Sequence, residues 1–364
     1  MKLKEIISFF EEIAPFSLQE SYDNSGIQIG NPDTEITGIL IGIDLTDEVL
    51  DEAIENDMNL ILTHHPIIFN GIKKLTGKSV VERLIVKAIK NDINVLSVHT
   101  NIDSVLNGVS GKMCDKLGLV NRKILDPIKE KLLKLVFFVP VDHAEKVRKS
   151  VFDAGAGVIG NYNSCSFNAE GKGSFKAGDG TIPYVGEKGE LHIEDEIRVE
   201  TILPQNLRGK VISALISSHP YEEVAYDLYP LANSWNSVGL GMIGEFEEAM
   251  EEHEFLNAVK TIFNTGCVRY TALRNKKVKK VAVCGGSGSF LLKKAIASGA
   301  DVFVSGDFKY HQFFDAEGKV VIVDIGHYES EQFTKELFYE LLTRKFPTFA
   351  LLLSEVNTNP INYL

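Results

Sequence analysis

Short apolar runs alternate with amphipathic segments in two separate parts of the chain. Each part contains three runs with the length of buried strands: 39–44, 59–63 and 93–98 in the first, and 280–285, 301–305 and 320–324 in the second. Between the first two runs of each set, residues 49–54 and 291–296 repeat apolar positions at helical spacing. Strands that alternate with helices predict βαβ units and a mostly parallel sheet in each part.

The two sets of runs form a diverged internal repeat. The segment Tyr22–Gly30 precedes the first set, and a similar segment, Trp235–Gly244, precedes the second. We therefore expect an α/β protein with two related lobes, residues 1–124 and 232–364, that face each other across a cleft. Ligands of such folds gather beyond the carboxyl ends of the strands.

Residues 125–231 interrupt this repeat with a different pattern. The pattern predicts, in order, a strand at 131–140, a helix at 142–155, strands at 173–177 and 196–200, a helix at 205–217 and a final apolar stretch at 224–228. The order β-α-β-β-α-β is that of a ferredoxin-like α+β unit. The sequence thus predicts an inserted domain between the two lobes.

Histidine and carboxylate side chains follow the strand ends of both lobes. His64 and His65 follow one run, Asp103 lies just past another, and His327 and Glu331 stand four positions apart, where residues of a helix share a face. Neighbours on a strand point to opposite faces, so the adjacent histidines favour two ions. Three imidazoles and two carboxylates suit two divalent ions about 3.5–4 Å apart, and mixed nitrogen and oxygen ligands favour zinc, iron or manganese.

Each of these residues also has an ordinary structural interpretation. Glu331 could be an acid favoured at a helix start, and the histidines could be hydrogen-bonded without any metal. Their combination at equivalent ends of repeated lobes favours the metal site. Weaker candidates are His99, Asp307 and His311 as supporting or proton-transfer groups, Gly285–Ser289 as an anion-binding loop, and His219–Glu223 as a helix-end or subunit contact. Which groups are catalytic stays undefined.

Composition narrows the class of protein and of partner. The chain has 364 residues, 44% of them hydrophobic and 24% charged, as in an ordinary globular protein of two or three units. A net charge of −12 argues against a nucleic-acid partner. No run is long enough to span a membrane and no signal-peptide core is present, so we expect no membrane partner and a cytoplasmic location. The four cysteines lack the spacing of a disulfide framework or structural zinc site.

Several of these motifs together resemble the Ngg-interacting-factor-three family in its longer, YqfO-like form. The matching segments are Tyr22–Gly26, Thr63–Pro66, His99–Asp103, Gly239–Gly241, Gly285–Gly288 and Gly326–Glu331. Members of the family carry the name GTP cyclohydrolase I type 2 homologue, and the resemblance covers essentially the whole chain. One departure is Tyr22, where members usually carry tryptophan. We expect it to change packing beside the cleft without affecting the metal ligands.

The resemblance implies a dinuclear metal site at the positions matching His64, His65, Asp103, His327 and Glu331. It also implies a ring-shaped homohexamer and a central insert similar to CutA and PII proteins. Three functions stay open. The first is a metal-dependent hydrolase that acts on a nucleotide or phosphoester-type small molecule through a water bridging two divalent ions. The second is a metal-binding regulatory or scaffold protein whose insert senses a small molecule or partner, and the third is metal storage or delivery.

Overall fold

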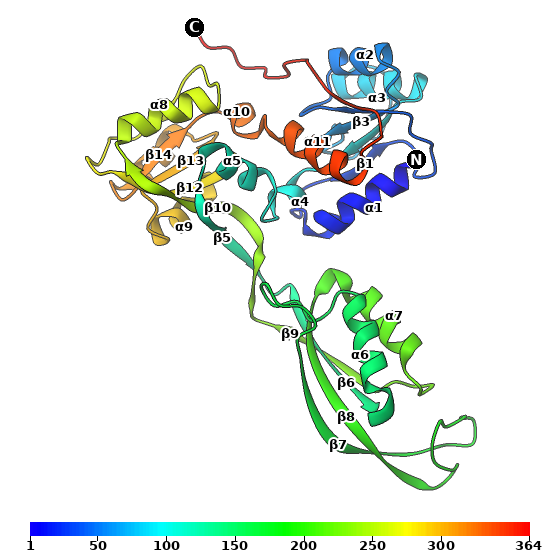
Figure 1. Cartoon of the computed structure of the whole chain (residues 1–364). Coiled ribbons are helices and arrows are strands. Elements are labelled where there is room, and N and C mark those ends of the chain that lie inside the picture. The colour runs from blue at the N-terminus through cyan, green and yellow to red at the C-terminus, as the bar shows by residue number, and fades with distance from the viewer. The chain divides into compact units, whose positions relative to one another are not determined.

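The structure is a computed structural model that describes all residues from 1 to 364 (Figure 1). It is a mixed α/β protein. Contacts divide the chain into two compact units. The first unit combines Met1–Pro127 with Ser237–Leu364, and the second is Ile128–Asn236. The chain therefore leaves the first unit, completes the second and returns to the first.

One five-stranded sheet of the first unit contains four parallel strands next to one another. In spatial order its strands are β1 (Gly26–Ile29), β4 (Asn94–Ser97), β3 (Leu60–Thr63), β2 (Ile39–Ile41) and β15 (Leu351–Leu353). Strand β15 pairs with β2 in parallel, whereas β1 pairs with β4 in the antiparallel sense. The residues of β2, β3 and β4 are all buried, which explains why each reads as a continuous apolar run.

A six-stranded sheet forms the other half of this unit. Its strands, in spatial order, are β11 (Arg269–Tyr270), β14 (Val321–Asp324), β13 (Val302–Gly306), β12 (Val278–Ser287), β10 (Ser234–Met250) and β5 (Val120–Lys129). Strands β12, β13 and β14 are parallel, and β10 and β11 pair with them in the antiparallel sense. All six strands predicted from the apolar runs are thus present in the two sheets.

The repeat holds for three parallel strands in each sheet, β2 to β4 and β12 to β14, and not for the strands beside them. The order β4-β3-β2 matches β14-β13-β12, but β1 lies beside β4 whereas β10 lies beside β12. Two edge strands also cross between the halves: β5 precedes the second unit yet joins the six-stranded sheet, and β15 ends the chain in the five-stranded sheet. These exchanges tie the two halves of the first unit together.

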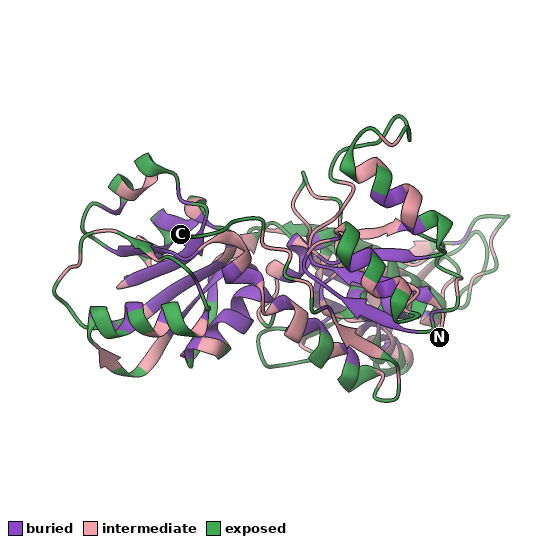
Figure 2. Cartoon of the chain, turned by 90° about the horizontal axis from the view of Figure 1, so that it is seen from above, coloured by how far each residue is buried: buried purple, intermediate pink, exposed green.

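Helices pack against both sheets of the first unit. They are α1 (Leu3–Ile13), α2 (Asp47–Glu55), α3 (Val80–Lys90), α4 (Thr100–Asp103), α5 (Val109–Leu117), α8 (Glu252–Ile262), α9 (Leu292–Ala297), α10 (His327–Glu331) and α11 (Thr334–Lys345), with short 3-10 turns at 16–18, 289–291 and 310–316. The side chains of Thr46 and Ser79 cap α2 and α3 by accepting backbone N–H groups. Figure 2 shows strands that are mostly buried and helices with one exposed side. None of the helices has both the length and the apolar character needed to cross a bilayer.

The second unit is a four-stranded antiparallel sheet covered on one face by two helices (Figure 1). Its elements, in chain order, are β6 (Leu132–Pro140), α6 (Ala144–Asp153), β7 (Ser166–Lys176), β8 (Leu191–Pro204), α7 (Arg208–Ser218) and β9 (Tyr226–Leu231), with 3-10 turns before both helices. The order β-α-β-β-α-β agrees with the predicted one, and the two middle strands are longer than predicted. The core lies between the helices and one sheet face, where Phe137, Val147 and Leu215 are fully buried.

Candidate metal centre

His64 and His65 lie where the chain leaves β3, and a turn brings both rings to the same side. The backbone N–H groups of both residues donate to the carbonyl of Ile43, at N···O distances of 3.1 and 3.0 Å. The ring centroids are 4.9 Å apart. The turn therefore removes the alternation that would point neighbouring strand residues to opposite faces, so alternation gives no support for two ions here.

One nitrogen of each of these rings is held by a partner on its own side of the cleft. Nδ1 of His64 lies 3.0 Å from the carbonyl oxygen of Val98, and Nδ1 of His65 lies 2.7 Å from Oδ1 of Asp44. Such partners fix the orientation of metal-binding imidazoles in proteins. The second nitrogen of each ring, Nε2, is thereby left to face the other half of the unit.

The other half contributes His327 and Glu331 from opposite ends of α10. Nδ1 of His327 lies 2.6 Å from Oδ2 of Asp307, and its Nε2 lies 3.1 Å from Oε2 of Glu331. The helix begins after Gly326. Its φ of +96° favours glycine, and a Cβ there would also lie 2.1 Å from Oε2 of Glu329. The local backbone therefore sets where α10 starts and which way its first side chain points.

The carboxylate of Glu331 is shared among three histidines. Its Oε1 lies 3.6 Å from Nε2 of His64, and its Oε2 lies 3.0 Å from Nε2 of His65 and 3.1 Å from Nε2 of His327. Each oxygen thus faces a different set of imidazoles. This is the disposition that a carboxylate bridging two cations requires.

Asp103, the last residue of α4, completes the cluster from the first half. Its Oδ1 lies 3.7 Å from Nε2 of His64. Two groups of three side chains have ligand atoms that all lie within 4.8 Å of one another: His65, His327 and Glu331, and His64, Asp103 and Glu331. The structure therefore brings together all five residues that the sequence predicts as metal ligands.

Two atoms in this cluster are buried without a hydrogen-bond partner. They are Nε2 of His64 and Oδ1 of Asp103. Buried polar atoms of native proteins are nearly always satisfied, and an unpaired one needs an explanation such as an ion. A cation between an imidazole nitrogen and a carboxylate oxygen would satisfy both. The five side chains therefore fit a divalent metal.

Proton affinities in the cluster follow from burial and from these contacts. Burial tends to raise the pKa of Glu331, but contacts with the neighbouring histidines hold it well below the usual range. Burial, with the charge of Glu331, holds the pKa of Asp103 well above its usual range. Burial lowers the pKa of His64, so this ring is neutral at pH 7 and can offer a lone pair to a metal.

The other two histidines behave differently because each has two carboxylate partners. Burial lowers the pKa of His65, yet hydrogen bonds to Asp44 and Glu331 raise it to about 10. For His327, burial also acts downward, while Asp307 and Glu331 raise the pKa to about 11. Without a cation, protons on these two rings balance the carboxylate charge.

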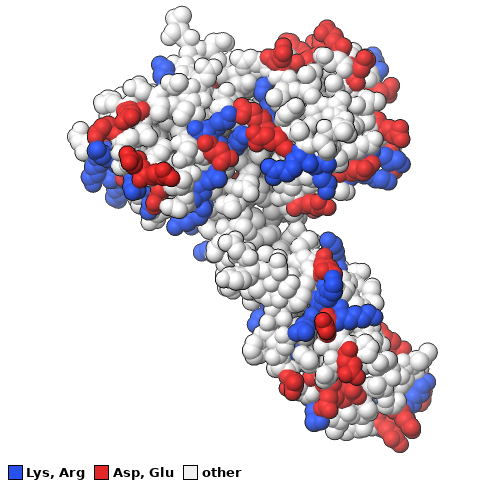
Figure 3. Space-filling model, viewed as in Figure 1, with Lys and Arg blue, Asp and Glu red and all other residues white.

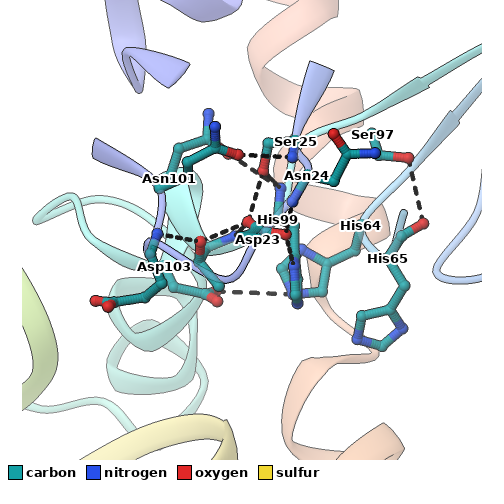
Figure 4. A network of polar contacts seen from close by, with 12 residues as sticks. Asp23, Asn24, Ser25, His64, His65, Ser97, His99, Asn101 and Asp103 are labelled. Carbon is teal, nitrogen blue, oxygen red and sulfur yellow. Dashed lines mark hydrogen bonds and ion pairs between the residues drawn. The ribbon is translucent and has the colours of Figure 1, made fainter. Parts of the chain in front are cut away.

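His99 lies at the edge of the cluster and is held by Asp23 (Figure 4). Its Nδ1 is 2.7 Å from Oδ1 of Asp23, and its ring centroid is 5.1 Å from that of His64. Asp23 also accepts hydrogen bonds from Thr100 and Ser25, at 3.1 Å from the Thr100 backbone nitrogen and 2.8 Å from Ser25 Oγ. His64, His65 and His99 form a third group of close ligand atoms, so His99 is placed as a supporting group of the site.

The structure places another of the weaker candidates at the site and two away from it. Asp307 is at the site through His327. His311 is not: its ring lies against Tyr310 and Phe314, and it does not line the cleft. His219 caps the end of α7 in the second unit, where its Nε2 lies 2.8 Å from the carbonyl oxygen of Phe138.

The chain also matches a known protein family. Residues 1–360 match the family model described as Duf34/NIF3 (NGG1p interacting factor 3). The chain belongs to the DUF34/NIF3 family. The resemblance drawn from the sequence motifs is therefore confirmed.

Relatives of this NIF3-family chain match it from end to end. A Halalkalibacterium halodurans protein named GTP cyclohydrolase 1 type 2 homolog is 42% identical over 365 residues, which cover 99% of this chain and 98% of the relative. A Bacillus subtilis protein with the same name is 39% identical over 371 residues, 99% of this chain and 98% of its own. The crystal structure of a Bacillus cereus protein related to NIF3 is similar with a TM-score of 0.86 and 40% identity, covering 100% of this chain and 99% of that one.

The roles of three residues of the NIF3-family site were not found from the sequence. Asp44 orients His65, and its signal was its place at the end of the apolar run 39–44. Gly286 has a φ of +60°, and a Cβ there would lie 2.3 Å from Oε1 of Glu331. Ser330 accepts the Gly286 N–H at 2.8 Å and donates to the carbonyl of His327 at 2.7 Å. The glycine loop at 285–289 thus makes room for the carboxylate, a role that its composition alone does not reveal.

A cleft of about 380 Å³ opens directly over the cluster in this NIF3-family chain. Four of the five predicted ligands line it: His65, Asp103, His327 and Glu331. Residues that follow strands of both sheets form its walls, in keeping with the position of ligand sites in α/β folds. A small molecule that enters this cleft meets the metal ligands directly.

Proposed function

We propose that this chain is a dinuclear divalent-metal-binding protein that hydrolyses a nucleotide or phosphoester-type small molecule. The observation that carries the proposal is the pair of buried, unpartnered atoms, Nε2 of His64 and Oδ1 of Asp103, beside a carboxylate that faces three imidazoles. The five ligands would be His64, His65, Asp103, His327 and Glu331. Two bound cations of zinc, iron or manganese type would supply Lewis acidity and lower the pKa of water.

The residues around the cluster have definable tasks in such a reaction. Asp44 and Asp307 orient the imidazoles of His65 and His327. Asp23 holds His99 at the wall of the cleft, where its imidazole can accept or deliver a proton. These side chains preorganise the site before substrate arrives.

Aromatic side chains around the cleft support a substrate with a planar group. Tyr22, Phe69 and Phe290 all line the cleft, with exposures of 63%, 47% and 62%. Large exposed rings at the wall of a cleft can stack on a planar base, and such stacking is worth about 1–3 kcal/mol per base in proteins that bind nucleotides. The rings of Tyr22 and Phe69 are already close, with centroids 6.3 Å apart. A nucleotide would present both a base for these rings and a phosphoester for the cluster.

We also propose that the partner of this chain is a small molecule and not a nucleic acid. On the face shown in Figure 3, Lys and Arg side chains are interspersed with Asp and Glu. Phosphate-backbone binding needs a clustered basic surface, and the net charge of −12 opposes it.

The family resemblance further suggests that residues 125–231 are an inserted CutA- and PII-like domain between lobes 1–124 and 232–364, and that the chain assembles as a homohexamer. Analytical ultracentrifugation of the purified chain tests the assembly.

Metal analysis combined with a hydrolysis screen tests the main proposal. Purified wild type, His64→Ala and Glu331→Ala are compared for metal content, and the wild type is assayed on nucleotides and phosphoesters. His311→Ala is the matched control, because His311 is exposed and outside the cluster. Equal metal content in wild type and both site variants would refute the ligand assignment. A metal-loaded wild type that hydrolyses nothing would favour the regulatory alternative, for which a second cavity in the chain gives specific support.

A further inference from the structure

The second unit contains a cavity of about 580 Å³ that is separate from the metal centre. Its volume lies within the range of small-molecule sites, about 300–1,000 Å³. Its floor is the face of the antiparallel sheet opposite α6 and α7, because Phe137 points into the helix-covered core while its neighbour Phe138 lines the cavity. The segments 177–184 and 221–225 contribute the remaining walls.

These wall segments are tied to each other by a specific contact. The carboxylate of Glu222 accepts the backbone N–H of Ile182, with N···O distances of 3.0 and 3.2 Å. A carboxylate bound to a backbone N–H is a charge-assisted hydrogen bond, stronger than a neutral one. The cavity is therefore bounded by segments that hold one another in place.

Three aromatic rings line the cavity in close succession. The centroid of Tyr221 is 6.1 Å from that of Phe175 and 6.2 Å from that of Tyr184. The hydroxyl oxygen of Tyr221 is buried and has no hydrogen-bond partner. Burial, and next the carboxylate of Glu196, raise the pKa of this hydroxyl, so it remains a donor at neutral pH. An unsatisfied hydroxyl among aromatic rings is a polar contact available to a ligand.

Two glycines of β7 create the space over the sheet. Gly171 and Gly173 lie on the floor, where side chains would otherwise stand. A Cβ on Gly173 would lie 2.2 Å from Oε2 of Glu196, so this glycine admits the carboxylate. A Cβ on Gly171 would meet no atom within 4 Å. Glycine inside a strand often marks a close approach by another group, and here the space above Gly171 is open.

The charge of the cavity is decided by which groups lack partners. Arg198 and Lys172 line it, but each pairs with a carboxylate outside the lining, Glu200 at 3.0 Å and Asp195 at 2.7 Å. Lys176 lines it without an ion pair, but it is outnumbered by the lining carboxylates of Glu170, Glu196, Glu222 and Glu223. Glu196 is only 9% exposed, and its carboxylate lies beside the Tyr221 hydroxyl and has no cation partner. A buried carboxylate without a cation is costly, and a cationic ligand would offset that cost.

The geometry points to a binding site for a planar organic cation in this cavity, with Glu196, beside the Tyr221 hydroxyl, as its counter-ion, and Phe175, Tyr184 and Tyr221 against its faces. Aromatic rings attract cations through the negative charge of their faces, and a carboxylate behind them adds to that attraction. The site is independent of the metal centre and of the reaction proposed for it.

A matched pair of probes tests the sign of the charge. Binding of 1-methylquinolinium and of neutral quinoline to the full chain is measured by calorimetry at pH 8. The two probes have nearly the same shape and differ in charge. We expect one site per chain, with the cation bound about tenfold more tightly or better. Equal binding of the two probes, or displacement of the cation by inorganic phosphate, would overturn the proposal.

Two variants locate the site and do not depend on each other. Glu196→Gln removes the charge and is expected to weaken 1-methylquinolinium binding about tenfold or more. Gly171→Val fills the open space without meeting any atom at its Cβ, so it should block binding while circular dichroism stays native. Glu145→Gln, an exposed charge on α6 across the sheet, is the control and should bind as wild type. Wild-type binding by Gly171→Val would exclude the cavity as the site, whatever the folding of the Glu196 variant.

Discussion

Oε2 of Glu331 lies 3.0 Å from Nε2 of His65, although the two residues are 266 positions apart in the chain. The contact joins α10 of one half of the first unit to the end of β3 of the other half. Because Glu331 is buried and also contacts His64 and His327, its carboxylate links the histidines of the two halves. Removal of its charge should therefore affect the whole cluster.

Glu331→Gln is expected to lower the affinity for divalent metal by at least about 100-fold, because an amide is a poor bridge between cations and leaves neighbouring ligands unbalanced. Competition with a chelator of known affinity measures the change. The wild type should also lose thermal stability when the chelator removes its metal, whereas the variant should lose little. Glu340→Gln, an exposed carboxylate on α11, serves as the control. Unchanged competition curves for Glu331→Gln would contradict the shared-carboxylate assignment.

Asp44→Asn tests whether the residue behind His65 matters as much as the ligand itself. The carboxylate accepts from Nδ1 of His65 at 2.7 Å and from Thr358 Oγ1 at 2.6 Å. An asparagine keeps the shape but loses the charge that orients the imidazole, so metal affinity should fall about 10–100-fold. Asp47→Asn, at the exposed start of α2, should leave affinity unchanged. If both variants bind metal as wild type does, Asp44 has no role in orienting the ring.

Gly286→Ala and Gly299→Ala both place alanine at a positive φ, and comparing them separates the cost of backbone strain from the cost of displacing Glu331. Gly286 has a φ of +60° and a Cβ there would lie 2.3 Å from Oε1 of Glu331, whereas Gly299 has a φ of +74° and no atom within 4 Å of its Cβ. We expect Gly299→Ala to cost about 1 kcal/mol of unfolding free energy through backbone strain alone. Gly286→Ala should cost about 2–4 kcal/mol and also weaken metal binding, because the carboxylate must move. Denaturant unfolding of both variants measures the difference, and equal costs would show that Glu331 yields freely.

The ligand set could be predicted from the sequence because each ligand stands shortly after an apolar run that reads as a buried strand. Strands β2 to β4 and β12 to β14 are visible in the same way, since buried parallel strands are apolar throughout. The element order β-α-β-β-α-β of the second unit was visible for a related reason: its helices show one apolar face, Val147 and Val151 on α6 for example.

Other features could not be predicted, because they depend on contacts between segments far apart in the chain. The pairing of β15 with β2 and the place of β5 in the six-stranded sheet follow from the closure of the two halves, which no local pattern encodes. Gly286 looked like a turn or anion loop, and only the position of Glu331 explains it. The turn at His64 and His65, whose backbone N–H groups both donate to the carbonyl of Ile43, is likewise a tertiary effect.

The Asp23–His99 contact predicts a pH dependence of stability in acid. Burial opposes the charged form of Asp23, but hydrogen bonds from His99 and Thr100 outweigh it and hold the pKa of this carboxyl far below its usual range. A lowered pKa in the folded state stabilises the protein above the unfolded-state pKa, about 4, and this contribution is lost as the pH falls below that value. Asp23→Asn should therefore cost about 1–3 kcal/mol at pH 7, and the gap from wild type should shrink between about pH 4 and pH 2.

Denaturant unfolding of wild type and Asp23→Asn across this range measures the gap. Asp33→Asn is the control, because that carboxylate is exposed and pairs only with Lys2 and Lys4, so its removal should leave the stability close to that of wild type. A gap for Asp23→Asn that stays constant down to pH 2 would mean that the charge of Asp23 does not stabilise the fold. A gap that shrinks as expected would show that the aspartate which holds His99 at the cleft also supports the fold around it.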